Sequence, residues 1–339
     1  MAAPVRVSVF MPVYNAGVHL REAITSILDQ TFKDFEFVIL NDGSTDASLD
    51  MICSFSDKRI RLINNPENIG LIASLNIGLK ECLGEYIVRM DQDDISLPER
   101  ISRQVTFMDS HPAIGLMGSW FEDFSDTNEG NVIRYDCFDT EIRIRHLHQT
   151  HISHPTAIIR TSVVRAHQLS FDPSFIHGED YEFWVRMSGF CKLANYPECL
   201  VRKRDHVNNI SNKYASDQQH SIRRVKLKQF DAMGISLSAD QLKLYDRFAD
   251  SEWNFSESEM EMLNELLPRI TEANDSSNFI PVAEFSQYIG RKWFHLCLNH
   301  PVLKRRAWSF YMGSPLRLRV KTGLVNTLKL LLKKRLAAR

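Results

Sequence analysis

The segment Glu85-Tyr-Ile-Val-Arg-Met-Asp-Gln-Asp-Asp94 places three carboxylates directly after a short apolar run. Such a run predicts a buried strand over 85–90. Side chains alternate between the two faces of a strand, so Asp91 and Asp93 point to the same side and can face one divalent cation. Carboxylate oxygens are the ligands that Mg²⁺ and Mn²⁺ prefer. The alternative is an acidic turn that only ends a strand and caps the next helix, above all at Asp94.

The region around this strand alternates short β-rich apolar runs with helical patterns from Val5 to about Leu97. The alternation predicts stacked β-α units and a mainly parallel, buried sheet, and therefore the α/β fold class. Sheets of this kind bind ligands at the carboxyl ends of their strands, where Asp91 and Asp93 fall. Strands are expected over 5–11, 35–40, 60–63 and 86–90, and helices over 20–28, 44–55, from 71 to a stop at 84, and from 96 onward.

Three segments are predicted from the changes of pattern along the 339 residues. Residues 1–215 form the α/β domain, 216–300 a helical appendage with a loop at 274–278, and 301–339 a basic amphipathic tail. No run approaches the roughly eighteen apolar residues that a membrane-spanning helix needs. The six cysteines show no C-x-x-C spacing and the first residues show no secretion leader, so a cytoplasmic protein is expected.

Charge is divided unevenly along the chain, although its net value is −1. Thirteen Lys and Arg but no Asp or Glu follow Glu284, so all 42 acidic residues lie up to Glu284 with the other 28 basic ones. This favours a tail helix on the anionic cytoplasmic face of the inner membrane, or one packed on the chain's own acidic domain. No nucleic acid is expected, because no recognisable reading motif accompanies the charge. The apolar face of the expected helix is formed by Leu324, Leu328, Leu331, Leu332 and Leu336.

Five motifs occur together in one order: Val9–Asn15 (VFMPVYN), Val38–Asp46 (VILNDGSTD), Asn68–Gly70, Met90–Asp94 followed by Pro98, and Gly178–Asp180. In this order they resemble family 2 glycosyltransferases of the bacterial surface-polysaccharide type, over roughly the first 210 residues. The resemblance implies the GT-A fold, a Rossmann-like, mainly parallel mixed sheet flanked by helices, here with a C-terminal helical appendage. It implies inverting transfer of one hexose or N-acetylhexosamine from a UDP-sugar to a glycan or lipid-linked saccharide. The Q-x-x-R-W motif of processive members is absent.

The resemblance also implies a donor site and a metal, Mn²⁺ or Mg²⁺. Asp42 would accept a hydrogen bond from the uracil N–H. Asp93 would bind the metal, and Asp91 would reach the ribose or the metal's water shell. His206 lies in Arg204-Asp205-His206, which is similar to the family's R-x-H segment and approaches the diphosphate or metal. The expected nucleotide-sugar-binding residues are Pro12, Tyr14, Asn15, Asp42, Asn68, Asp91 and Gln92.

The acceptor side needs a base, because a sugar hydroxyl is a poor nucleophile until its proton is taken. The resemblance assigns this role to Asp180. His154, Glu179 and Trp184 are expected beside the acceptor. The alternative for Glu179-Asp180 is helix capping, and both roles can coexist.

Three other functions compete with sugar transfer. His146, His148, His151 and His154 have a spacing that could hold zinc, but no cysteine flanks them and His154–Ile158 resembles the family's acceptor-side stretch. A sugar-nucleotide pyrophosphorylase would need a glycine-rich loop after the first strand, where only Gly17 occurs. A catalytically silent carbohydrate- or membrane-binding protein with this fold is the alternative from another class.

Overall fold

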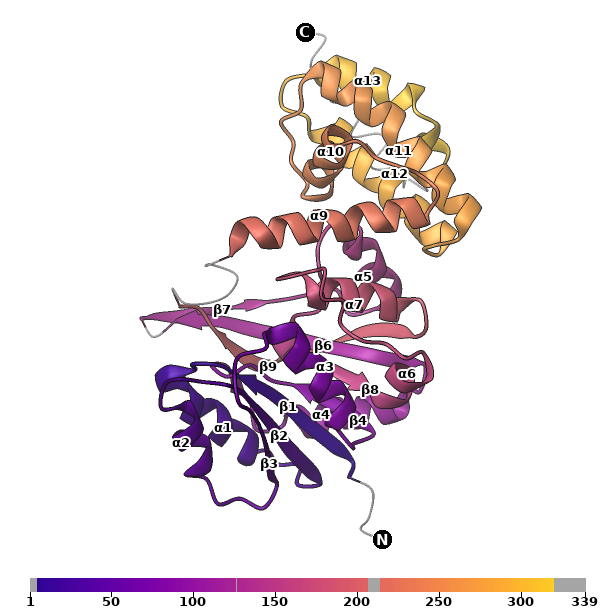
Figure 1. Cartoon of the computed structure of the whole chain (residues 1–339). Helices are drawn as coiled ribbons and strands as arrows, with labels where there is room; N and C mark the ends of the chain where they lie inside the picture. Colours follow the sequence, from indigo (N-terminus) through magenta and orange to yellow (C-terminus); the bar gives the residue numbers. More distant parts are fainter. Residues whose placement is uncertain (1–4, 126, 207–213, 320–339) are drawn as a thin grey trace. The chain divides into compact units, whose positions relative to one another are not determined.

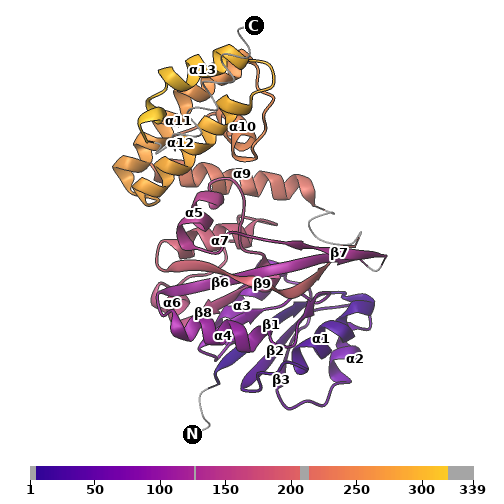
Figure 2. The same ribbon diagram turned by 180° about the vertical axis from the view of Figure 1, so that it is seen from behind.

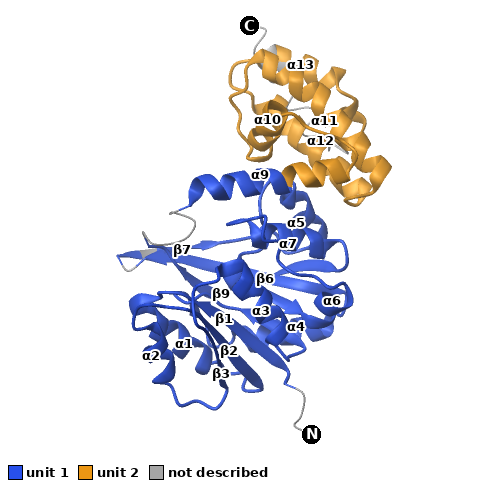
Figure 3. Cartoon of the chain, viewed as in Figure 1, with its two compact units in different colours: residues 1–225 blue, residues 226–339 orange. Residues whose placement is uncertain are grey.

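The structure is a computed structural model that describes residues 5–125, 127–206 and 214–319 (Figure 1). It forms two compact units, 1–225 and 226–339 (Figure 3), which are described separately. The sequence places the first boundary at 215, and the helix α9 (Ala215–Ala232) runs through both positions. The division at 225 arises because Val225 and Ile222 of α9 pack against Phe175 and Tyr181 of the first unit.

One mixed sheet forms the centre of the first unit, with the strand order β3-β2-β1-β4-β8-β6-β9-β5 and with β7 paired to β6. β3, β2, β1 and β4 run parallel, whereas β8 is antiparallel to both of its neighbours. Figure 2 shows the long strands β6 and β9 side by side, and their pairing is parallel. The strands are β1 (Val7–Val13), β2 (Phe35–Asp42), β3 (Ile60–Asn65), β4 (Tyr86–Arg89), β5 (Ile95–Ser96), β6 (Ile114–Ser125), β7 (Asn128–Ile133), β8 (Ile158–Arg160) and β9 (Lys192–Arg204).

Two hydrophobic cores cover the two faces of the sheet, because alternate residues of each strand point to opposite sides. Val9 and Met11 of β1 pack with α1, α2 and α4, whereas Phe10 packs on the other side with α3, α5, α6 and α7. The helices of this unit are η1 (Gly17–His19), α1 (Leu20–Leu28), α2 (Ser48–Cys53), α3 (Leu71–Glu81), α4 (Arg100–Ser110), α5 (Asp139–His146), η2 (His154–Thr156), α6 (Thr161–Ala166) and α7 (Glu179–Ser188).

The four predicted strands and the first three predicted helices are confirmed, with ends shifted by a few residues. The helix expected from Ser96 begins only at Arg100. The reason is that Ile95 and Ser96 form β5, which pairs antiparallel with Arg202 and Val201 of β9.

The second unit is helical, and it contains α10 (Ala239–Ala249), α11 (Glu257–Ser277), α12 (Val282–Asn299), α13 (Lys304–Gly313) and η3 (Pro315–Arg319). The loop predicted at 274–278 is wrong, because α11 continues to Ser277. The Asn274 amide is buried and hydrogen-bonds both the N–H and the C=O of Ile280, at 2.8 and 2.9 Å. Asn278 then ends the helix in the left-handed conformation.

The predicted amphipathic helix over 324–336 lies outside the described residues. None of the helices within 5–125, 127–206 and 214–319 is long and apolar enough to cross a membrane.

Candidate active site

The carboxyl ends of β1, β2 and β4 meet at one edge of the sheet, because β1 lies between the other two and all three are parallel (Figure 1). The order of the strands reverses between β1 and β4, which is where open α/β sheets bind ligands. The segments that leave these strands, 14–19, 43–47 and 90–94, contain most of the predicted donor-site residues.

The loop after β1 is fastened to the loop after β2. Asn15 Oδ1 accepts a hydrogen bond from the Thr45 N–H at 2.9 Å, and the Gly17 N–H donates to Asp46 Oδ2 at 3.1 Å. The other oxygen of Asp46 accepts from the Ser48 N–H at 2.9 Å and so holds the start of α2. The Asn15 side chain is therefore used to join the two loops.

Gln92 holds the same loop from the side of β4. Its Oε1 accepts from the Tyr14 N–H at 2.8 Å, and its Nε2 donates to the Tyr14 carbonyl at 3.2 Å. This leaves the Tyr14 ring 44% exposed at the edge of the sheet. Pro12, in contrast, lies buried within β1 opposite Leu40 of β2, so it shapes the strand and presents no side chain at that edge.

Asp42 ends β2 and is 3% exposed. Its Oδ1 accepts from Asn65 Nδ2 at 2.8 Å and from the Ile69 N–H at 3.0 Å, and its Oδ2 accepts from the Gly70 N–H at 2.9 Å. An ionised carboxylate offers about four acceptor positions, so one remains for the predicted bond from uracil. The same loop carries Asn68, whose side chain is exposed. Asp42 thus fixes the loop that would border a bound nucleotide.

The close approach of that loop requires glycine at position 43. Gly43 has φ +65°, and a Cβ there would lie 2.3 Å from the Glu67 carbonyl carbon and 2.6 Å from the Asn68 nitrogen. We expect Gly43→Ala to cost about 2–4 kcal/mol, because left-handed strain and a backbone clash add. We also expect it to weaken nucleotide binding, since it displaces the loop that Asp42 holds.

Thermal unfolding and nucleotide titration of Gly43→Ala measure both effects. Gly234→Ala is the matched control, because Gly234 also has a positive φ, +88°, and no atom lies within 4 Å of the place that a Cβ would occupy. Equal losses of stability in the two variants would contradict the predicted clash.

The acidic segment after β4 is arranged by three different partners. Asp91 Oδ1 pairs with Arg89 Nη2 at 2.6 Å, and Asp93 Oδ2 lies 3.0 Å from His206 Nε2. Asp94 is buried and accepts from the Arg204 N–H at 2.8 Å. The structure thus brings together Asp93 and His206, the two predicted metal ligands, which are 113 residues apart in sequence.

The Arg204-Asp205-His206 segment is tied to the acidic segment by further bonds. Arg204 Nε donates to the Asp93 carbonyl at 3.1 Å, and its Nη2 pairs with Glu22 of α1 at 2.5 Å. The His206 ring also lies 5.5 Å from the ring of His19. The bonds of Arg204 therefore fix the end of β9, and His206 follows two residues later beside Asp93.

Crowding of the three carboxylates shifts their pKa values. Burial, together with the charge of Asp91, raises the pKa of Asp93, and burial with the charges of both neighbours holds the pKa of Asp94 well above its ordinary value. Burial also acts to raise the pKa of Asp91, but the charges of Arg89, His154 and Lys203, together with the hydrogen bond from Arg89, outweigh it and the net pKa is lowered. Asp91 therefore remains ionised, in a place where a bound cation would relieve the repulsion.

The number and type of these side chains decide whether they could bind a divalent metal. Within the described part of the chain, no three His, Cys, Asp or Glu side chains converge on one metal position. Asp93 and His206 supply two ligands, and Asp91, 33% exposed, lies next to them. Mg²⁺ is commonly held by one or two carboxylates with water and substrate phosphates. The residues therefore fit a cation that binds together with a diphosphate.

Two arginines that the sequence did not single out lie behind the carboxylates. Arg89 is 4% exposed, and Arg100 of α4 is fully buried. Arg100 Nη2 donates to the Arg89 carbonyl at 2.7 Å and its Nε to Gln104 at 3.2 Å, and Gln104 in turn donates to the Thr156 carbonyl at 2.8 Å. Burial lowers the pKa of Arg100 to about 9. This helix thus fixes the end of β4 and the η2 turn together.

Glu179 and Asp180 lie in the first turn of α7. Charged residues at the end of β4 affect the pKa values of both. Asp180 Oδ1 accepts from the Tyr181 N–H at 2.7 Å, so it also holds the helix start. Burial raises the pKa of Asp180 to about 6, and the charge of Asp91 contributes to this rise. Burial and the charge of Asp180 raise the pKa of Glu179 to about 8. The charge of Arg89 opposes both shifts, so the acids of α7 interact electrostatically with Arg89 and Asp91.

The other predicted acceptor-side residues pack beneath this turn. Trp184 is fully buried, and its ring meets the His154 ring edge-on at 5.7 Å. Within the described residues, the Trp184 Nε1, His154 Nε2 and Glu179 Oε2 atoms have no hydrogen-bond partner. Trp184 therefore packs on His154 beneath the first turn of α7.

Three of the four histidines of the H-x-H-x-x-H-x-x-H run pack against different aromatic or backbone partners. The His146 ring packs edge-on against Tyr181 at 5.8 Å. His151 Nε2 accepts from the Asp136 N–H at 2.8 Å, and His154 faces Trp184. These contacts serve the packing of α5, η2 and α7.

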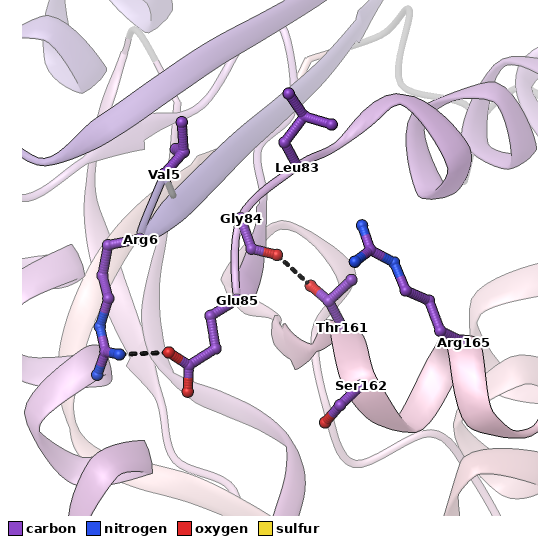
Figure 4. Close-up of a pocket in the computed structure, with 8 residues that line it drawn as sticks. All are labelled: Val5, Arg6, Leu83, Gly84, Glu85, Thr161, Ser162 and Arg165. Atoms are coloured by element: carbon purple, nitrogen blue, oxygen red, sulfur yellow. Dashed lines mark hydrogen bonds and ion pairs between the residues drawn. The ribbon is translucent and has the colours of Figure 1, made fainter. Parts of the chain in front are cut away.

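A cavity of about 540 Å³ lies at the opposite edge of the sheet, where β1 and β4 begin (Figure 4). Arg6 pairs with Glu85 across it, and Thr161 Oγ1 donates to the Gly84 carbonyl at 2.8 Å. It is remote from Asp91, so it has no part in the chemistry of that site. Its lining consists of Val5, Arg6, Leu83, Gly84, Glu85, Thr161, Ser162 and Arg165.

Comparison with known proteins decides the family. Residues 8–167 match the family model described as Glycosyl transferase family 2. An uncharacterised glycosyltransferase of Haemophilus influenzae is 38% identical over 231 residues, which cover 65% of this chain and 72% of the relative. The chain belongs to glycosyltransferase family 2. The family predicted from the five motifs is thereby confirmed.

Two further relatives place this glycosyltransferase among known proteins. The amylovoran biosynthesis glycosyltransferase AmsE of Erwinia amylovora is 30% identical over 203 residues, covering 58% of this chain and 75% of AmsE. The structure of S. aureus TarS 1–349 in complex with UDP-GlcNAc has a TM-score of 0.58 at 17% identity, covering 93% of this chain and 90% of TarS. This likeness confirms the GT-A fold.

Proposed function

We propose that this glycosyltransferase is an inverting, divalent-metal-dependent enzyme that moves one hexose or N-acetylhexosamine from a UDP-sugar. The observation that carries the proposal is the convergence of three groups at one sheet edge. They are the Asp93–His206 pair, the ionised Asp91 beside it, and the Asp180 carboxylate, whose pKa is raised to about 6.

The donor would bind between the loops that leave β1, β2 and β4. The remaining acceptor position of Asp42 takes the uracil N–H, and the exposed Tyr14 ring borders the base. Asp93 and His206 would hold Mn²⁺ or Mg²⁺ when the donor diphosphate is bound, and Asp91 would reach the ribose or the water shell of the metal. When bound, the metal offsets the negative charge that develops on the departing UDP.

Asp180 acts on the acceptor. Its carboxylate takes the proton of the attacking sugar hydroxyl, and the hydroxyl oxygen forms a bond to the anomeric carbon as the bond to the diphosphate breaks. Attack from the face opposite the leaving group inverts the configuration, so an α-linked donor gives a β-glycoside. A pKa of about 6 suits this role, because the carboxylate is ionised at neutral pH yet a better base than an exposed aspartate.

The acceptor is proposed to be a glycan or lipid-linked saccharide of a cell-surface polysaccharide, which receives one sugar per encounter. Similarity to AmsE, a protein named for amylovoran biosynthesis, supports this class. Within the described residues, no helix that could span a membrane accompanies the catalytic unit.

The test of the donor is thermal stabilisation by nucleotide sugars with and without Mn²⁺, because a ligand that binds the folded state raises Tm by mass action. UDP-, GDP-, ADP- and dTDP-sugars are compared at equal concentration. The proposal expects a Mn²⁺-dependent shift that is largest for UDP-sugars. A shift confined to a purine nucleotide would refute the uracil contact, and no shift with any nucleotide would favour the silent binding protein.

The tail is proposed to hold the enzyme on anionic membrane. In the described part of the second unit, Arg306 pairs with Glu257 and Arg319 with Asp275, so these charges serve the unit itself. Arg317 and Leu318 are exposed just before the basic stretch 321–339. We expect binding to vesicles containing phosphatidylglycerol, at about 1 kcal/mol per basic residue near the surface, weakening with salt.

Deletion of 320–339 is the measurement that checks the tail, because Leu316 is buried and η3 is left in place. Sedimentation with anionic and with neutral vesicles compares the full chain and the truncated one. Equal sedimentation of both chains with anionic vesicles would refute the membrane role.

A further inference from the structure

A stacked pair of aromatic rings lies next to the catalytic turn. The rings of His177 and Tyr214 are 4.4 Å apart, with 16° between their planes. His177 comes three residues before Asp180, and Tyr214 comes directly before α9, where its carbonyl accepts from the Gln218 N–H. Tyr214 is 39% exposed. Two segments distant in sequence thus present an aromatic surface beside the proposed base.

Side chains of α9 hydrogen-bond to the backbone of the segment that contains His177. Ser221 Oγ donates to the Ile176 carbonyl at 2.7 Å, and Arg224 Nη1 donates to the Ser174 carbonyl at 2.6 Å. A Cβ on Gly178 would lie 2.8 Å from the Cβ of Ser221, so glycine is needed for this approach. The loop over 174–178 is therefore positioned by contacts from α9 that involve neither the half-buried His177 ring nor the exposed Tyr214 ring.

His177 is held in an unfavourable conformation. Its φ of +61° lies in the left-handed region, which residues with a side chain seldom adopt and which recurs at active sites and ligand clamps. The core below the loop is completed by Phe175, Tyr181 and Val225 without His177 or Tyr214. The apolar cluster below the loop therefore includes neither ring.

The chemistry of the pair suits a sugar ring. A pyranose has one face made of C–H groups, and such a face packs on a flat aromatic surface while its hydroxyls remain free for polar partners. Burial lowers the pKa of His177, partly opposed by Asp217, so the imidazole is neutral at pH 7 and the surface carries no charge. Asp217 of α9 is exposed nearby and can accept bonds from hydroxyls.

We propose that His177 and Tyr214 form a platform that binds a sugar ring of the acceptor and so holds its hydroxyl near Asp180. The platform rests on the proposed transfer reaction, whose substrate class it specifies: a saccharide that offers an apolar pyranose face. It also gives α9, which lies beyond the region matched by the family model, a role in acceptor binding.

A second stacked pair provides a matched control. His167 and Phe190 are 4.0 Å apart with 17° between their planes, and Phe190 is 50% exposed. Phe190 lies beyond the end of α7, whereas Asp180 lies at its start, and the ten residues of that helix span about 15 Å. Each pair stacks a histidine on a partly exposed aromatic ring, and the two pairs lie at different distances along the chain from the proposed base.

The experiment is saturation-transfer NMR with three probes: the methyl β-glycosides of glucose, galactose and N-acetylglucosamine. The full chain is compared with Tyr214→Leu and His177→Asn, which removes the ring and keeps a residue that tolerates a positive φ. We expect saturation on one face of at least one glycoside, reduced about fivefold in both variants and unchanged in Phe190→Leu. Two variants on different segments guard against loss of folding in one of them.

The proposal is overturned if no glycoside receives saturation from the full chain, or if the signal survives in both platform variants. An equal loss in Phe190→Leu would also overturn it. The thermal shift caused by UDP-sugar and Mn²⁺ is measured on the same samples. It distinguishes failure of the platform proposal from failure of the proposed transfer reaction. A donor shift without a glycoside signal refutes the platform alone, whereas loss of both refutes the proposed transfer reaction.

Discussion

Asp180→Asn is expected to lower kcat for sugar transfer by about 10²–10⁴-fold, the usual contribution of a positioned general base. The amide has nearly the shape of the carboxylate and can still accept from the Tyr181 N–H, so the start of α7 is preserved. It cannot take a proton from the acceptor hydroxyl. The proposed donor site lies at the ends of β1, β2 and β4, so the affinity for UDP-sugar is expected to change little.

Asp240→Asn is the matched control for this variant. Asp240 is also the second residue of a helix, α10, but it lies in the second unit. The substitution removes the same helix-end charge without touching the proposed site. Unchanged transfer by Asp180→Asn, or an equal loss in Asp240→Asn, would assign the base elsewhere.

The pH profile of the unmodified enzyme offers a further check on Asp180. The reactive form is the carboxylate, and burial raises its pKa to about 6. kcat/KM, which reports the free enzyme, should therefore be constant well above that pH and fall about tenfold for each unit well below it. A group with an ordinary aspartate pKa would still be almost fully ionised at pH 5, so nearly full activity at pH 5 would contradict this assignment.

Asp93→Asn is expected to lower kcat/KM by about 10²–10³-fold and to abolish the effect of Mn²⁺ on donor binding. The amide removes the charge that pairs with His206 at 3.0 Å, while the backbone is still held by the bond from Arg204 Nε. His206→Gln should act in the same direction but more weakly, because the carboxylate remains. Calorimetric titration of UDP with and without Mn²⁺ measures the change.

Asp57→Asn controls for the loss of an ion pair. Asp57 pairs with Arg59 at 2.8 Å in the first unit, between α2 and β3, and the Arg59 hydrogen bonds lower its pKa to about 2. Breaking this pair should reduce stability and leave the response to Mn²⁺ intact. A normal Mn²⁺ response in Asp93→Asn would place the metal on other residues.

The sheet could be predicted because its strands are short apolar runs separated by helical patterns. The register of β1 with β2 and β4 follows from burial of both faces, and it fixes where Tyr14, Asp42 and Asp91 emerge. Helix ends were less predictable. Ile95–Ser96 resembles a helix start beside Pro98, but its strand partner is more than 100 residues away in β9.

Residues of the candidate site could be predicted only where they belong to a recognisable sequence motif. The contact between Asp93 and His206 was expected from the resemblance, but no local pattern indicates that Arg100 supports the end of β4 from α4. Arg89 carries a signal of its own, since a charged residue within a buried run needs a partner. The pairing of His177 with Tyr214 depends on how the loop over 174–178 packs on α9, which the sequence pattern does not encode.

Inverting transfer at Asp180 is tested most directly by the anomer that the enzyme releases when water replaces the acceptor. The full chain is incubated with a UDP-α-sugar and Mn²⁺, and the first-formed free sugar is followed by proton NMR before mutarotation mixes the anomers. The β-anomer is predicted to appear first, together with UDP, and to be absent with Asp180→Asn. An α-anomer formed first, or undiminished release by Asp180→Asn, would contradict single displacement with Asp180 as the base.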